Sequence, residues 1–121
     1  MAVKKYSVIL NKKIKEFNKV IEPDSDKSIS IRAFLIGSIS QGVSKISNVL
    51  LSQDIFSTIE CLKKLNCKII KEGKSRYKIL GKGLGSYYTK KNTLLDLGNS
   101  GTGLRLISSI ISTTPNIEVN L

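Results

Sequence analysis

The chain has 121 residues, 40% of them hydrophobic, which suits one ordinary domain or part of a larger fold. It carries 20 lysine and arginine residues against 9 acidic ones, a formal net charge of +11, and it has no histidine. The missing histidine excludes a Cys/His zinc site and a histidine-activated nucleophile. No apolar run could span a membrane and no signal peptide precedes the first strand, so we expect a cytoplasmic protein without a membrane partner.

The positive charge is concentrated in two stretches. Residues 1–20 hold six lysines and one glutamate (+5), and residues 61–92 hold ten basic residues and one glutamate (+9). Residues 21–60 (three basic, five acidic) and 93–121 (one basic, two acidic) carry −2 and −1. We interpret the excess as a solvated lysine surface and expect no nucleic-acid partner. We interpret Cys61 and Cys67 as reduced structural residues and expect no metal.

The first half of the chain predicts two short strands, a helix and a third strand. The strands are expected at 6–10 and 19–22, where Pro23 ends the second by removing a backbone donor. A helix is expected over 27–40 and closes at Gly42, and a half-buried strand follows over 43–49. The apolar stripe expected on the buried side of this helix is Ala33, Leu35, Ile36 and Ile39.

The second half predicts a helix, a hairpin and a further β-α-β start. Ser52 is the expected N-cap of a helix that runs to about residue 65, followed by a hairpin of 67–71 with 76–80. The glycine-rich stretch 81–85 lacks a following helix, so we interpret it as a plain surface loop. A strand over 93–97, a helix over 101–112 and a strand from 117 complete the chain. The stripes expected to be buried are Ile55, Ile59 and Leu62 in one helix and Leu104, Ile107, Ile110 and Ile111 in the other.

Two helix starts have the chemistry of anion sites. A helix N-terminus has unpaired N–H groups and a partial positive charge, so it favours an anion. At the first start Lys27 lies at the mouth, and Ser28 and Arg32 are four apart, on one helical face. The second start, 98–105, places Gly, Asn and Ser residues before Arg105. The sequence therefore predicts a protein that handles two anionic groups.

Three segments resemble one enzyme family in order and spacing. PDSDKSISIRAFLIGSISQG resembles the first signature of the 5-enolpyruvylshikimate-3-phosphate synthases, and GNSGTGLRLISSII resembles their second. Between them, SNVLLSQDIFSTIECLKKLNCKI resembles the family's N-x-L-x-S-x-D pattern. The resemblance covers roughly residues 20 to 121. It implies an α/β (α+β) fold of two lobes built from β-α-β-α-β-β units, joined by an inverse hinge.

The resemblance also implies domain boundaries and a reaction. Residues 21–121 would form the first unit and the start of the second unit of the N-terminal lobe, and residues 1–20 would pack with the C-terminal lobe. The implied reaction transfers the enolpyruvyl group of phosphoenolpyruvate to the 5-hydroxyl of shikimate 3-phosphate and releases phosphate, without a cofactor. The lobe's remaining units and the second lobe are missing, so we expect an inactive N-terminal fragment of a monomeric family that self-associates when isolated.

Site residues follow from the resemblance position by position. Lys27 would contact both substrates and act in catalysis, while Ser28 and Arg32 would bind shikimate 3-phosphate. Asn99 and Gly101 would bind phosphoenolpyruvate together with Lys27, and Arg105 would steady that loop without direct contact. Asp24-Ser25-Asp26 has one residue more than the family's usual spacing between Pro and Lys, which could shift Lys27 or merely bulge the turn. The alternatives are an inactive remnant and a basic RNA-binding module.

Overall fold

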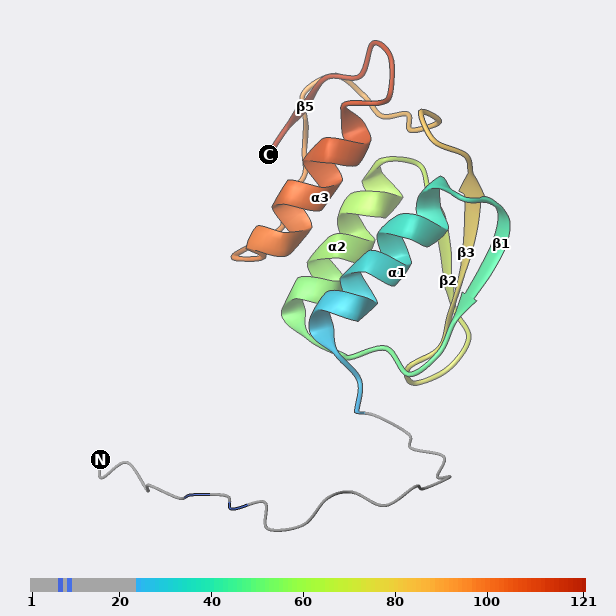
Figure 1. Ribbon diagram of the computed structural model, residues 1–121. Helices are drawn as coiled ribbons and strands as arrows, with labels where there is room; N and C mark the ends of the chain where they lie inside the picture. The colour runs from blue at the N-terminus through green and yellow to red at the C-terminus, as the bar shows by residue number, and fades with distance from the viewer. Residues whose placement is uncertain (1–6, 8, 10–23) are drawn as a thin grey trace.

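The computed structural model describes Ser7, Ile9 and residues 24–121. The strands expected at 6–10 and 19–22, and the role expected for residues 1–20, lie outside the described residues. The described elements are α1 (Lys27–Ile39), β1 (Gln41–Ile46), α2 (Gln53–Lys64), β2 (Lys68–Lys71), β3 (Tyr77–Lys82), β4 (Thr93–Leu94), α3 (Gly101–Ile111) and β5 (Val119–Asn120) (Figure 1). Their order confirms the predicted alternation of helices and strands from residue 27 onwards.

The strands form two small sheets. β3 lies in the middle of an antiparallel sheet of order β1-β3-β2, in which Ile79 pairs with Ser44 on one side and Ile69 on the other. The predicted hairpin is therefore confirmed. β4 pairs with β5 in parallel, and the Leu95 amide extends this pairing by donating to the Asn120 carbonyl at 2.8 Å. The strand predicted over 93–97 is shorter than expected because the ladder ends at Leu94.

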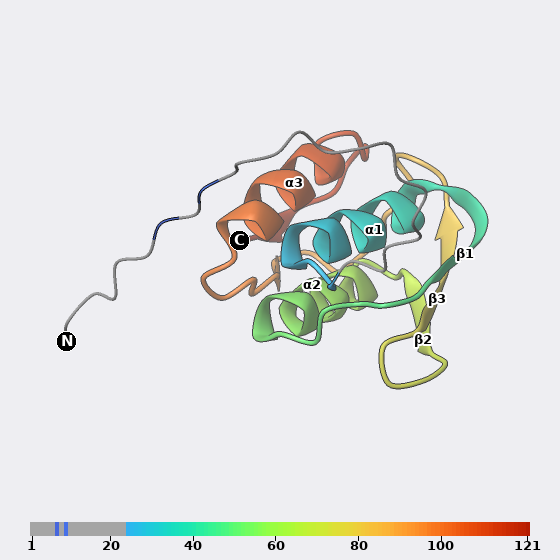
Figure 2. The same ribbon diagram turned by 60° about the horizontal axis from the view of Figure 1, so that its bottom comes forward.

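Helices α1 and α2 both pack against the antiparallel sheet, and α3 packs against α1. All three helices lie on the same side of the antiparallel sheet, as Figures 1 and 2 show. Phe34 of α1 packs edge-on against Tyr77 of β3 with ring centroids 5.2 Å apart, and both side chains are buried. Such an aromatic pair adds about 0.5–1.5 kcal/mol beyond the burial of its area. Within the described residues the helices cover one face of the sheet, and no described element packs on its other face.

Two residues expected in the buried stripes are exposed. Ile36 of α1 is 60% exposed and Leu104 of α3 is 42% exposed, so these two predictions are wrong. Helix α1 instead buries Ile31 and Phe34 beside Leu35. Its apolar residues surround the helix on nearly all sides, so periodicity alone does not select the buried face. The stripe Ile55, Ile59 and Leu62 of α2 is buried as predicted.

A close backbone approach joins α1 to β3. A Cβ at Gly81 would overlap the carbonyl oxygens of Ser40 and Gly37, so only glycine fits there. Gly81 and Lys82 belong to β3, which corrects their interpretation as part of a surface loop. Nearby, the buried hydroxyls of Ser38 and Tyr87 share a hydrogen bond, and burial raises the pKa of Tyr87 to about 12. The C-terminal end of α1 is therefore held firmly.

Candidate functional site

Asp26 caps helix α1 directly before Lys27. Its carboxylate accepts a hydrogen bond from the Ile29 amide at 2.7 Å, and its backbone carbonyl accepts from the Ser30 amide. The additional residue of the Asp24-Ser25-Asp26 stretch therefore precedes the cap and is not inserted into the helix. Lys27 is the first helical residue, where it was predicted. An N-cap carboxylate also interacts favourably with the positive end of the helix dipole before any ligand binds.

Lys27 forms an ion pair that sequence reasoning did not identify. Its Nζ lies 2.8 Å from Oδ2 of Asp54, which stands in the first turn of α2. The Asp54 side chain is only 14% exposed, whereas that of Lys27 is 51% exposed. In the sequence, Asp54 is the last residue of the N-x-L-x-S-x-D pattern. A pairing between residues 27 positions apart depends on the packing of two helices, which no local pattern predicts.

A hydroxyl fixes the approach of these two helix starts. Ser30 Oγ donates to the Asp26 carbonyl at 2.7 Å and accepts from the Leu50 amide at 3.1 Å. The segment that leads into α2 is thereby attached to the first turn of α1. Because Ser30 is buried, these hydrogen bonds are shielded from water and hold the geometry well. This attachment explains why Asp54 reaches Lys27.

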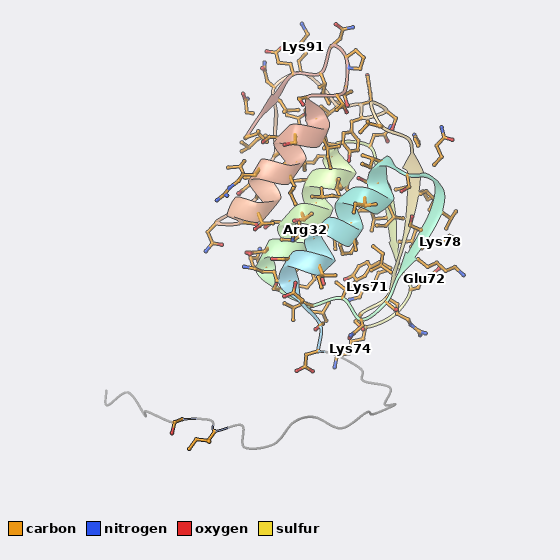
Figure 3. All side chains as sticks on the ribbon, viewed as in Figure 1. Arg32, Lys71, Glu72, Lys74, Lys78 and Lys91 are labelled. Atoms are coloured by element: carbon orange, nitrogen blue, oxygen red, sulfur yellow. The ribbon has the colours of Figure 1, made fainter. Side chains whose placement is uncertain are left out.

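Ser28 and Arg32 lie together on the outer side of α1. Arg32 is exposed, and its guanidinium donates to the Ser28 carbonyl at 3.1 Å (Figure 3). The predicted four-residue spacing does bring the two residues into contact. The remaining guanidinium N–H groups of Arg32 form no ion pair within residues 24–121. They can therefore bind an oxyanion in the forked geometry that arginine favours.

The start of α3 is open and rich in glycine. Ser100 is the N-cap, and its hydroxyl accepts from the Gly103 amide at 3.2 Å. Asn99 and Gly101 are exposed, and Gly98 takes a left-handed backbone conformation with φ of 58°. A groove of about 400 Å³ runs along residues 95–101 and is completed by Leu104 and Leu121. Asn99 and Gly101 therefore line one concave surface, as a shared ligand site requires.

The first turns of all three helices point to the same end of the molecule. Figures 1 and 2 show α1, α2 and α3 with their N-termini on this end. A Cβ built at Gly98 would lie 4.0 Å from Ser57 Oγ, so the loop before α3 lies beside the second turn of α2. Among residues 24–121, no hydrogen bond or ion pair joins Lys27, Ser28 or Arg32 to Asn99 or Gly101. The structure thus places both predicted groups at one end without direct contact.

The charges at this end differ between the two groups. At α1, the cations Lys27 and Arg32 are balanced by the carboxylates Asp26 and Asp54. At α3, Ser100 is an uncharged cap, and Asp96 accepts from the Gly98 amide at 2.8 Å. The positive ends of three helix dipoles therefore lie together at this end of the molecule. At the start of α1 the two positive and two negative side chains balance. An incoming anion would compete with the Asp54 carboxylate for the positive charge of Lys27.

Neither cysteine belongs to the groups of predicted site residues at the two helix starts. Both are free and buried, as predicted, and burial raises the pKa of the Cys61 thiol to about 11. Cys61 Sγ donates weakly to the Asp96 carbonyl at 3.4 Å. Residues 24–121 contain no cluster of three or more His, Cys, Asp or Glu side chains that could hold a metal. No helix of this described part is long and apolar enough to cross a bilayer.

Comparison with known proteins identifies the family. The family model of EPSP synthase (3-phosphoshikimate 1-carboxyvinyltransferase) matches residues 11–121. The 3-phosphoshikimate 1-carboxyvinyltransferase of Thermoanaerobacter sp. (strain X514) is 48% identical over 101 residues, and that of Bacillus cytotoxicus is 45% identical over 101 residues. These matches cover 83% and 84% of this chain but 23% of each relative, so the chain spans about a quarter of their length.

A solved structure agrees in fold as well. EPSP synthase from Acinetobacter baumannii superposes with a TM-score of 0.67 at 28% sequence identity. The superposition covers 74% of this chain and 20% of that protein. The predicted fold class, with mixed helices and strands of part of an enolpyruvyl transferase lobe, is therefore confirmed. The chain belongs to the EPSP synthase (3-phosphoshikimate 1-carboxyvinyltransferase) family.

Proposed function

We propose that this chain supplies substrate-binding residues for the transfer of the enolpyruvyl group from phosphoenolpyruvate to the 5-hydroxyl of shikimate 3-phosphate. The observation that carries the proposal is the meeting of both signature helix starts at one end of a chain of this family. Both substrates are anions, and helix N-termini with basic side chains favour anions. The proposal places residues 21–121 in the N-terminal lobe and residues 1–20 with the C-terminal lobe.

Each residue has a distinct role in this proposal. Ser28 and Arg32 bind shikimate 3-phosphate, since the hydroxyl and the free guanidinium N–H groups of one helical face suit its phosphate. Asn99 and Gly101 bind phosphoenolpyruvate in the groove before α3. Lys27 contacts both substrates and is the catalytic residue of this chain. Asp54 is a positioning residue, because it holds the Lys27 ammonium between the starts of α1 and α2.

The reaction needs charge stabilisation and alignment. The 5-hydroxyl group loses its proton as its oxygen bonds to C2 of phosphoenolpyruvate, and C3 gains a proton, which gives a tetrahedral intermediate. Loss of phosphate from C2 and of a proton from C3 then yields the enolpyruvyl ether. Lys27 would offset negative charge as the phosphate departs, and fixed helix dipoles supply the same kind of stabilisation without reorganisation. Holding two substrates in register accounts for much of the rate enhancement in such additions.

Binding to the full chain tests the site, and phosphate release tests the reaction. We expect shikimate 3-phosphate to shift the NMR amide signals of Lys27 and Ser28, and phosphoenolpyruvate to shift those of Asn99 and Gly101. Phosphate release is then measured with both substrates, with either substrate omitted as the control. Binding without release would place the remaining catalytic groups outside these 121 residues. If neither substrate moves any of these amides, the proposed site is refuted.

A further inference from the structure

The open face of the antiparallel sheet has a regular chemical pattern. Ile79 and Tyr77 of β3 are buried against α1, so their neighbours Lys78 and Leu80 face the other way. Figure 3 shows Lys78 on the side of the sheet away from the helices. Residues directly opposite in the register share a face. We define the outer sheet face by the two rungs that all three strands share, Val43, Lys45, Lys68, Ile70, Lys78 and Leu80; Lys82 of β3, beyond the end of β2, faces the same way.

Lysine and aliphatic side chains alternate on this outer sheet face. Every strand contributes one lysine and one aliphatic residue, two positions apart. Val43 is 56% exposed and Ile70 is 38% exposed, so the aliphatic positions are accessible. None of the three lysines has an ion pair within residues 24–121. The acidic residue nearest in sequence, Glu72, lies beyond β2, where its amide bonds to the Arg76 carbonyl at 2.9 Å.

The arrangement of lysines on the outer sheet face lowers the stability of the isolated chain. Lys45 lies directly opposite Lys78 in the ladder, and like charges at opposed positions destabilise a sheet. A residue pair that lowers stability without a partner is typical of a surface kept for binding. A carboxylate placed over the pair would remove the repulsion. The charge arrangement is therefore complementary to an acidic partner.

The chemistry of the outer sheet face selects among acidic partners. Single-stranded nucleic acids are held by aromatic stacking and arginine, and this face has neither. Membrane-binding surfaces gather their apolar residues into one strip and anchor with Trp or Tyr, whereas this face has no aromatic residue and only Val43 and Leu80 among its aliphatic residues stand directly opposite each other. An extended polypeptide presents the same alternation on one face when every second residue is in turn acidic and aliphatic, because residues i, i+2 and i+4 share a face.

We propose that the outer sheet face binds an extended segment of another protein in which acidic and aliphatic side chains alternate at every second position. The carboxylates lie over Lys45, Lys68 and Lys78, and the aliphatic side chains fill the spaces beside Val43, Ile70 and Leu80. This surface lies on the sheet side of the molecule, separate from the helix starts, so the proposal stands independently of the enolpyruvyl transfer. It predicts an association that weakens as salt concentration rises.

The test is a binding titration of the full chain with a labelled peptide of repeated Glu-Ser-Val-Ser, which places glutamate and valine in turn on one face of an extended chain. The double variant Lys45→Gln/Lys78→Gln should weaken binding about fivefold, the effect of removing two exposed ion pairs. The control Lys90→Gln/Lys91→Gln makes the same change in net charge in the loop before β4, remote from this face (Figure 3), and should change affinity by less than about twofold. Val43→Ser keeps the charge and should still weaken binding measurably.

Several results would overturn the proposal. If a peptide with glutamine in place of glutamate binds equally well, the carboxylates do not contribute to binding and the proposal is wrong. Equal losses in both double variants would show a general charge effect and no defined surface. Two further ligands are compared with the peptide: oligouridylate, and vesicles of phosphatidylcholine and phosphatidylserine. If either binds more tightly than the peptide, the face belongs to another kind of partner. Folding is checked independently, because relief of the Lys45–Lys78 repulsion should raise the thermal midpoint of the variant by about 2 °C.

Discussion

The starts of α1 and α3 use the same helix geometry with opposite side-chain chemistry. At α1 the cap is a carboxylate, and Lys27 already has a charged partner in Asp54. At α3 the cap is a hydroxyl, and exposed Asn99 and Gly101 flank it in an open groove. A ligand anion at the first start would compete with Asp54 for Lys27, whereas the second start offers the exposed Asn99 side chain beside Gly101, whose own amide donates to the Asn99 carbonyl at 3.0 Å. The difference predicts that charge changes matter most at α1 and steric changes most at α3.

Lys27→Ala should have the largest effect. In the protein that carries out the proposed transfer, loss of this ammonium should lower turnover by about 10²–10³-fold, the usual cost of removing one group that stabilises transition-state charge. Lys63→Ala is the matched control, since Lys63 forms an exposed ion pair of the same 2.8 Å length with Glu60 on α2. Phosphate release measures both variants. Near-normal turnover in Lys27→Ala would contradict the catalytic role.

Gly101→Ala should separate the two substrates. The added methyl group should raise KM for phosphoenolpyruvate about tenfold, as one extra carbon in a tight site does, and leave KM for shikimate 3-phosphate unchanged. A Cβ there meets only the Arg105 guanidinium at 3.7 Å, so the fold has room for it. Gly103→Ala is the structural comparison, because its Cβ would lie 2.8 Å from Ser100 Oγ and should lower the thermal midpoint. Equal KM changes for both substrates would refute the assignment of Gly101.

Asp54→Asn should increase the affinity of the empty site for a simple anion. Without the carboxylate, Lys27 no longer shares its charge, so the dissociation constant of inorganic phosphate should fall about threefold at low salt, as expected for one ion pair near the surface. Calorimetric titration at two salt concentrations measures the change. Asp96→Asn removes a carboxylate near α3 that pairs with no cation within residues 24–121, and serves as the control. Unchanged phosphate binding in Asp54→Asn would show that the ion pair does not limit access to Lys27.

The caps should give the smallest effects. Asp26→Ala and Ser100→Ala each remove one N-cap hydrogen bond and should lower the free energy of unfolding by about 1 kcal/mol. The loss at Asp26 should be the larger of the two and should shrink with added salt, because its charge also interacts with the helix dipole. Urea unfolding at low and high salt measures both. A salt-independent loss at Asp26 would mean that its charge contributes nothing.

Sequence reasoning predicted the helices and the hairpin well because their signals are local. Ser52 stands at the predicted N-cap position of α2, although its hydroxyl makes no capping hydrogen bond, Asn66 follows the end of α2 with a positive φ of 64°, and the alternation in β3 matches its burial. It failed where a signal depends on packing between elements. Ile36 fits the helical period but lies on the side of α1 that the described residues leave uncovered. The Lys27–Asp54 pair likewise depends on the Ser30 hydrogen bond that joins α1 to the segment before α2.

The roles proposed for Ser28, Arg32, Asn99 and Gly101 came from the family resemblance and not from geometry. Helix starts with serine, asparagine or glycine occur in proteins of every function, since these residues also cap helices. What the structure adds is their placement at one end of three parallel helices. That placement follows from the topology, which brings residues about 70 positions apart in sequence to the same end.

The contact at Gly81 has a mechanical consequence for the opposite end of α1. The helix spans 13 residues, so Lys27 lies about 20 Å along the axis from the backbone that Gly81 touches. The Ser30 hydrogen bonds hold the start of the same helix against the segment before α2. A side chain at position 81 would push the Ser40 end outward and strain these bonds, and with them the approach of Lys27 to Asp54. Selection for the proposed anion site would therefore also act on a strand residue at the far end of the helix.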